Sequence, residues 1–251
     1  MPAICLIVPC YNEEDRFNQE AFSSFLAKNP NYHILFINDG SSDGTAQMLS
    51  SFTDGIGQAE LLDLAQNGGK AEAVRQGVLQ AEKNKMYDLI GFIDADLATP
   101  LEEILSFENV FENNDHFLVA LGSRWKRLGA QIDRNVVRHY LGRIFATITS
   151  ILFSFSIYDT QCGAKLMRNK DLDKIFSQPF LSPWFFDIEI ICRYQNLYPE
   201  REIDDWAIEI PLNKWREIGG SRIKIWDFIK APLALLRIRT HYRKKDVQKE
   251  R

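Results

Sequence analysis

Long uncharged apolar runs are missing from this sequence of 251 residues. The longest candidate covers residues 144–158, and Ser and Thr interrupt it. A helix that crosses a bilayer needs about 20 predominantly apolar residues. We therefore predict a buried helix here, and no membrane-spanning segment.

Cysteine and histidine are also scarce, with four of each. The cysteines stand singly, without a C-x-x-C pair, and the histidines have no metal-ligand spacing. This distribution argues against a disulfide framework, a zinc site and cysteine catalysis. It favours reduced, mostly buried thiols in a cytoplasmic protein. The formal net charge of −4 argues against nucleic acid as a partner.

The first half alternates short apolar runs with helix-like segments. Such alternation with short connections predicts a mostly parallel α/β sheet with helices on both faces. Polar or glycine-containing loops follow the predicted strands, so they should gather at one edge of the sheet. The predicted strands lie near residues 4–8, 34–37, 61–64, 89–93 and 117–121.

The second half predicts a long helix over 134–155, a strand over 164–167 and a helix from residue 183. A strand within 202–212 contains Pro211, which places it at a sheet edge or strand end. We predict one domain over 1–222 and a C-terminal segment over 223–251. That segment has an apolar side with a kink near Pro232 and a basic tail, and two interpretations stay open. It anchors on an anionic membrane surface, or it packs on the domain with a solvated tail.

The stretch Asp94-Ala95-Asp96 follows a strongly apolar predicted strand. Alone, this pair fits either a turn with two solvated carboxylates or a site for Mg²⁺ or Mn²⁺. Glu13 and Asp39 also follow ends of predicted strands. Together, the four acids predict a nucleotide and metal site at one sheet edge.

Two further motifs offer cations to that edge. Gly68-Gly69-Lys70 begins a predicted helix, although it lacks the Walker A pattern. Gly122-Ser123-Arg124 follows the fifth predicted strand, and Arg138 comes after it. Arginine suits bidentate binding of phosphate, while surface charge is the alternative.

Taken together, the ordered motifs resemble family 2 glycosyltransferases of the GT-A fold, in the dolichyl-phosphate β-glucosyltransferase branch with polyprenyl-phosphate relatives. The resemblance rests on residues 8–13, 38–45, 67–70, 94–96, 122–124, 159–166 and 186–189.

The resemblance implies a role for each matching residue. It implies a nucleotide-sugar site, metal ligands, an acceptor-phosphate site, active-site acids and a lid. The nucleotide-sugar site would consist of Pro9, Tyr11, Glu13, Asp39, Lys70, Asp94, Ala95 and Asp96, and the metal ligands would be Asp94 and Asp96. The acceptor phosphate would bind Arg124 and Arg138, and the catalytic residues would be Asp96, Arg124, Asp159 and Asp187. The lid would carry Trp215, Ser221 and Arg222.

We therefore expect an inverting transfer of a hexose, most simply glucose, from a UDP-sugar to a polyprenyl phosphate. The expected place is the cytoplasmic face of a membrane, with the C-terminal segment as a peripheral anchor. Ala98 stands where mannosyltransferase relatives often carry a metal-binding Gln, which favours the glucosyl branch. Two alternatives remain: a family 2 transferase with a hydroxyl acceptor such as a glycan, and a catalytically silent nucleotide-sugar-binding protein.

Overall fold

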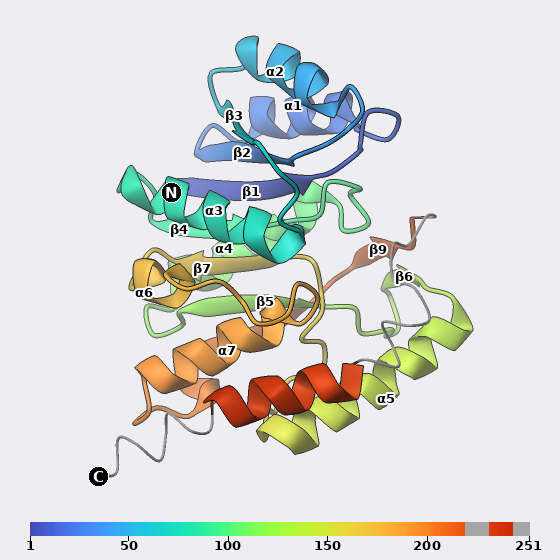
Figure 1. Cartoon of the computed structure of the whole chain (residues 1–251), viewed down its shortest axis with the longest axis vertical. Helices are drawn as coiled ribbons and strands as arrows, with labels where there is room; N and C mark the ends of the chain where they lie inside the picture. Colours follow the sequence, from blue (N-terminus) through green and yellow to red (C-terminus); the bar gives the residue numbers. More distant parts are fainter. Residues whose placement is uncertain (219–230, 243–251) are drawn as a thin grey trace.

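A seven-stranded sheet forms the centre of the protein, in the order β3-β2-β1-β4-β7-β5-β8 (Figure 1). The structure, a computed structural model, describes residues 1–218 and 231–242, and the side chains of residues 136–141 are also left out. Six of the strands run parallel, and β7 is antiparallel to both of its neighbours. The strands are β1 (Ile4–Cys10), β2 (Tyr32–Asp39), β3 (Ala59–Leu64), β4 (Leu89–Phe92), β5 (Val119–Ser123), β7 (Lys165–Arg168) and β8 (Ala207–Pro211).

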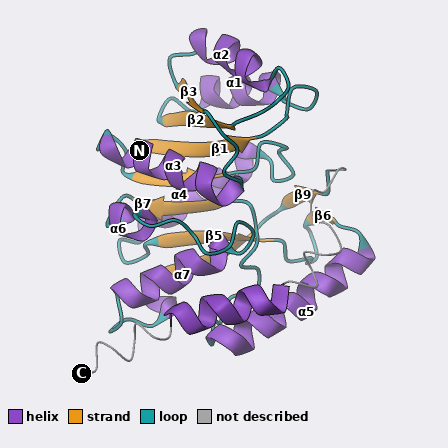
Figure 2. Ribbon diagram, viewed as in Figure 1, coloured by secondary structure: helices purple, strands orange, loops and turns teal. Residues whose placement is uncertain are grey.

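Helices cover both faces of this sheet (Figure 2). The helical elements are α1 (Gln19–Lys28), α2 (Thr45–Asp54), α3 (Lys70–Lys83), η1 (Leu101–Glu103), α4 (Ile104–Asn113), α5 (Val136–Phe153), α6 (Leu172–Phe176), α7 (Phe186–Leu197) and η2 (Ile203–Asp205). Side chains of α1, α2 and α4 fill one apolar core, and those of α3, α6 and α7 fill the other. Along β1, Leu6 enters the first core and Ile7 the second, because successive strand residues point to opposite faces. Burial on both faces explains why β1 reads as a continuous apolar run. The predicted α/β fold is confirmed.

Two features of the second half were not predicted. The apolar run near residue 164 is a strand, as predicted, but β7 runs antiparallel between β4 and β5. A small second sheet of β6 (Gln131–Asp133) and β9 (Lys214–Arg216) was not predicted. Pro211 lies in β8 at the edge of the main sheet, in agreement with its missing N–H donor.

Helix α5 is less buried than the sequence predicts. Ile144, Ile148 and Ile151 are 58%, 41% and 74% exposed, and they recur at the spacing of one helix face. On the other side of the helix, Thr149 is buried and Phe145 stacks on Phe185 at 5.2 Å between ring centroids. This helix therefore has an apolar stripe on its outer side. Among the described residues, no helix combines the length and apolar character needed to cross a bilayer.

Residues 231–242 form a helix that packs on α7 (red in Figure 1). Leu235, Ile238 and Tyr242 are buried at helical spacing. The Tyr242 hydroxyl donates to Glu189 Oε2 at 3.0 Å and accepts from Arg193 Nε at 2.9 Å. The packed alternative therefore holds for this part of the C-terminal segment. The predicted apolar residues 225–229 lie outside the described residues, and the proposed boundary at 222 and 223 stays a prediction.

Candidate active site

The carboxyl ends of β1, β2 and β4 meet at one edge of the sheet because these three strands are parallel neighbours. Pro9 is near the end of β1, and the loop after it carries Tyr11 and Glu13. The Glu13 backbone N–H donates to Thr45 Oγ1 at 2.8 Å, and its carboxylate binds Arg16 at 2.8 Å. Asp39 ends β2, while Asp94 and Asp96 follow β4. The predicted convergence of these four acids at one edge is observed.

Asp39 fixes the glycine turn before α3. Its carboxylate accepts hydrogen bonds from the backbone N–H groups of Gly68, at 2.7 Å, and Gly69, at 2.9 Å. Gly69 has a φ of +83°, a backbone region that favours glycine. Burial raises the pKa of Asp39, and the two N–H donors oppose that rise. A single carboxylate thus holds the start of α3 beside the end of β2.

Lys70, the first residue of α3, joins this turn to the two aspartates. Its Nζ lies 2.5 Å from Asp94 Oδ1. Burial alone would lower the pKa of Lys70, but the charges of Asp94 and Asp187 raise it above its ordinary value. Lys70 is therefore a fixed cation at the centre of the acidic edge.

The residues around Asp96 fit a divalent cation. Asp96 Oδ1 accepts from the backbone N–H of Ala98 at 3.0 Å. Burial raises the pKa of Asp96, and the negative charge of Asp94 raises it further. A cation would relieve both costs, and paired carboxylates are suitable ligands for Mg²⁺ or Mn²⁺. The described residues contain no group of three or more His, Cys, Asp and Glu side chains that could bind a metal alone. Most of a metal's ligands would thus come from substrate and water.

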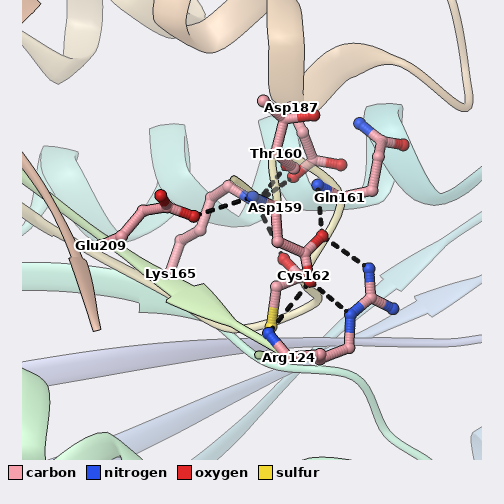
Figure 3. Close-up of polar contacts among 8 residues, drawn as sticks. All are labelled: Arg124, Asp159, Thr160, Gln161, Cys162, Lys165, Asp187 and Glu209. Carbon is pink, nitrogen blue, oxygen red and sulfur yellow. Dashed lines mark hydrogen bonds and ion pairs between the residues drawn. The ribbon is translucent and has the colours of Figure 1, made fainter. Parts of the chain in front are cut away.

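Arg124 and Asp159 form a largely buried pair beside this acidic edge (Figure 3). Arg124 Nε donates to Asp159 Oδ2 at 2.7 Å, and Nη2 donates to Oδ1 at 2.8 Å. Burial alone would raise the pKa of Asp159, but the Arg124 charge and hydrogen bonds lower it to about 2. The Arg124 guanidinium also lies 5.5 Å from the ring centroid of Trp215 in β9. Arg124 is thereby held in one orientation.

A second buried ion pair, Lys165 with Asp187, lies behind the loop 159–163, which carries Asp159. Lys165 is fully buried, and its Nζ lies 2.6 Å from Asp187 Oδ1. The ammonium also donates to the backbone carbonyls of Thr160, at 3.1 Å, and Cys162, at 2.8 Å. Figure 3 shows the Lys165 side chain extending toward this loop and toward Asp187. Both acids of the later motifs are therefore bound to cations.

The loop 159–163 touches the acidic edge at Gly163. A Cβ atom placed on Gly163 would stand 2.0 Å from Asp94 Oδ2, too close for any side chain. With the Asp94 carboxylate in its observed position, only glycine lets this loop come so close. Asp94 thus contacts both Lys70 and the loop that carries Asp159.

An open cleft of about 920 Å³ borders Asp96. Its walls come from the start of the chain, the loop after β4, and the small β6 and β9 sheet. They include Arg16, Leu97, Trp215 and Arg216, so the cleft is both apolar and basic. A ligand of some size can therefore approach Asp96 from this side.

Some predicted site residues cannot be placed. The side chain of Arg138 in α5 and all of Ser221 and Arg222 lie outside the described residues. Lys165 and Glu209 were missed, although both shape the site. The Glu209 carboxylate accepts from the backbone N–H groups of Tyr158, at 2.7 Å, and Asp159, at 2.8 Å. A lysine inside the apolar run near residue 164 was the available signal, because a buried ammonium needs close acceptors.

Comparison with known proteins gives the family of this chain. The model of glycosyl transferase family 2 matches residues 5–176, which is more than half of the chain. The chain belongs to glycosyl transferase family 2. Its similarity to curated members extends over nearly its full length. It is 31% identical to a dolichyl-phosphate beta-glucosyltransferase of Trichomonas vaginalis, over 94% of this chain and 71% of that protein. It is also 31% identical to the dolichyl-phosphate beta-glucosyltransferase of Saccharomyces cerevisiae, over 95% of this chain and 75% of that protein.

Solved structures of other transferases share the GT-A fold of this family 2 member. Glucosyl-3-phosphoglycerate synthase of Mycobacterium tuberculosis, in complex with Mn²⁺ and UDP-glucose, aligns with a TM-score of 0.63 and 15% identity, over 94% of this chain and 79% of that one. A mannosyltransferase of Pyrobaculum calidifontis, in complex with GDP-mannose and Mn²⁺, aligns with a TM-score of 0.60 and 14% identity, over 94% and 63%. At these identities the likeness concerns the fold. This family 2 chain is a glycosyltransferase.

Proposed function

We propose that the protein transfers glucose from UDP-glucose to a polyprenyl phosphate of the dolichyl type, with inversion at the anomeric carbon. The names of its curated relatives support glucose and the lipid phosphate. In this proposal Pro9, Tyr11, Glu13 and Asp39 hold the nucleoside. Asp94, Asp96 and Lys70 face the diphosphate.

One structural observation carries the choice of acceptor. The two acids that could act as a general base are both in ion pairs: Asp159 binds Arg124, and Asp187 binds Lys165. Because Arg124 lowers the pKa of Asp159 to about 2, that carboxylate is a weak base at neutral pH. A hydroxyl acceptor needs a base to take its proton, whereas a phosphate is already ionised. With both candidate bases held in ion pairs, and with Lys70 and Arg124 nearby, the site suits a phosphate acceptor.

The proposed step is a displacement at the anomeric carbon. An oxygen of the acceptor phosphate forms the new bond, and the bond to the UDP oxygen breaks with its electron pair. A divalent cation held by Asp94 and Asp96, when bound, would stabilise the negative charge of the leaving diphosphate. Lys70 adds a fixed positive charge beside Asp94. Arg124 orients the acceptor, since only two of its five N–H groups bind Asp159.

A transfer assay tests this function directly. UDP-glucose, UDP-galactose and GDP-mannose are each offered with a short polyprenyl phosphate and Mn²⁺, and the matching polyprenol without phosphate is the control acceptor. We expect product only when UDP-glucose is the donor and the polyprenyl phosphate is the acceptor. Transfer to the polyprenol or to a glycan would favour the hydroxyl alternative. An absence of transfer and of donor hydrolysis would favour the silent binding protein.

The role of Asp187 gives a second test of the acceptor. We expect Asp187→Asn to keep most of the rate with the lipid phosphate, because an amide oxygen can still accept from Lys165. Asp96→Asn should lose most of it. A large loss for Asp187→Asn with intact UDP binding would instead assign Asp187 as a base and argue for a hydroxyl acceptor.

A peripheral position at the cytoplasmic face of a membrane completes the proposal. The exposed stripe of α5, Ile144, Ile148 and Ile151, offers an apolar contact surface. Residues 230–251 carry eight Lys and Arg against two acids, which suits anionic lipid. All four cysteines are buried thiols, in keeping with a reducing compartment. A lipid-bound acceptor requires such a position.

A further inference from the structure

Lys165 is a charged side chain next to the site with no exposed surface. Its ammonium has three acceptors: the carbonyls of Thr160 and Cys162, and Asp187 Oδ1. These match the three N–H groups of an ammonium. We propose that Lys165 is a positioning residue, which holds the loop 159–163 in the shape that places Arg124 and Asp94 for transfer. The proposal rests on the proposed function and adds a residue to it.

Burial of this lysine has a cost that burial of a methionine would not have. An ionised group removed from water is unfavourable unless hydrogen bonds and an opposite charge replace its hydration. A long apolar side chain of the same size would fill the space beside Phe92, whose ring centroid lies 5.4 Å from Nζ. The ammonium therefore does something that packing cannot. It draws two backbone carbonyls of one loop toward a single point.

The position of that loop decides the position of two groups at the site. At one end, Asp159 binds Arg124 through two hydrogen bonds from its guanidinium. At the other end, Gly163 approaches Asp94 so closely that no Cβ atom fits between them. Glu209 fixes the backbone before the loop through the N–H groups of Tyr158 and Asp159. Lys165 fixes the backbone between these ends, where no strand or helix does.

A simpler role for Lys165 is neutralisation of Asp187. The two roles separate in the double variant Lys165→Met/Asp187→Asn, which removes both charges but also both bonds to the loop carbonyls. If Lys165 only neutralises Asp187, it is not needed once Asp187 is replaced by a neutral residue. The double variant should then recover both the stability and the transfer rate that Lys165→Met loses. A positioning role predicts recovery of stability alone.

The experiment compares Lys165→Met, the double variant and the control Lys174→Met. Lys174 pairs with Asp171 on the surface, with its side chain 59% exposed. We expect the double variant to bind UDP as the wild type does and to melt above Lys165→Met. Its kcat should stay about 100-fold low, the scale of loss for a displacement of about 1 Å at a reacting centre. Lys174→Met should match the wild type. Wild-type kcat in the double variant would overturn the proposal.

Hydrogen exchange gives a readout that needs no activity. In the wild type the backbone N–H of Gln161 donates to Asp159 Oδ1, and the backbone amides of the loop should exchange slowly. The loop peptide should lose protection in the double variant, while the 39–70 region keeps it. Fast exchange of the wild-type loop would overturn the proposal, even if no variant folds. If the wild type transfers no sugar, the proposed function fails, and exchange still decides whether Lys165 orders the loop.

Discussion

Asp96 combines two effects that make its charge sensitive to pH. Burial raises its pKa first, and the charge of Asp94 raises it further. Protons and a divalent cation therefore compete for this carboxylate at a pH above the ordinary value for aspartate. We expect Mn²⁺ affinity, measured by calorimetry in the presence of UDP, to fall as the pH is lowered from 8 toward 5. Asp96→Asn should bind weakly at every pH. A pH-independent affinity would exclude Asp96 as a ligand.

Gly163 offers a test of the contact between the loop and Asp94. In Gly163→Ala the new methyl group meets Asp94 Oδ2, so the carboxylate or the loop must move. We expect kcat to fall about 100-fold, with the fold retained. Gly57→Ala is the matched control, because a Cβ there meets nothing within 4 Å. Equal activity of the two variants would show that transfer does not depend on the observed position of Asp94.

Asp159 contributes stability through its pair with Arg124. Removal of one partner from a fully buried ion pair costs about 3–5 kcal/mol. Arg124 keeps 15% of its side chain exposed, so Asp159→Asn should lower the free energy of unfolding by up to that amount. The folded pKa of about 2 lies below the unfolded value. The contribution is therefore complete above the unfolded pKa of about 3.9 and is lost as the pH falls toward 2. In urea unfolding, the difference in free energy of unfolding between the wild type and Asp159→Asn should be constant from pH 5 to 8. It should become smaller below pH 4. A difference that varies between pH 5 and 8 would contradict this.

At the scale of elements, the helix over residues 231–242 carries one buried leucine and one exposed leucine. Leu235 is 1% exposed and Leu233 is 71% exposed. Leu235→Ala should cost about 2–5 kcal/mol, because it leaves a cavity in the core beside α7. Leu233→Ala should change the free energy of unfolding by no more than about 0.5 kcal/mol. Urea unfolding of the two variants checks this. Equal effects would mean that the helix does not pack as observed.

The sequence reveals elements better than it reveals pairing. Residues 89–93 and 164–167 read as apolar strands, and both are strands. A run of four residues does not indicate whether a strand runs parallel or antiparallel, so the direction of β7 could not be predicted. The strands β6 and β9 have three residues each, too few for a periodic pattern.

The candidate site shows the same division. Asp39, Asp94 and Asp96 converge as predicted, because strand ends alone bring them together. The partners of Arg124 and Asp187 could not be predicted from neighbours in the chain, since Asp159 is 35 residues from Arg124 and Lys165 is 22 residues from Asp187. Such pairs follow from the packing of strands and loops.

At the scale of the whole molecule, the outer stripe of α5 predicts how the protein meets lipid. Replacement of Ile144 and Ile151 by Asp puts two charges on that stripe, and charge at a lipid contact is unfavourable. We expect this double variant to sediment less with vesicles that contain anionic lipid, while it unfolds like the wild type. Met86→Asp, a change at a 65% exposed site far along the chain, is the control. Unchanged vesicle binding of the stripe variant would exclude α5 as the contact.

The antiparallel strand β7 also has a consequence for synthesis of the chain. Strands β3, β2, β1 and β4 are neighbours in the sheet, and all four lie within residues 4–92. A nascent chain can therefore assemble half of the sheet early. The open edge of β4 must then wait until β7, at 165–168, leaves the ribosome, because β5 reaches the sheet only through β7. An unpaired strand edge invites association with other chains. Between the synthesis of β4 and that of β7, this strand edge is therefore open to association with other chains.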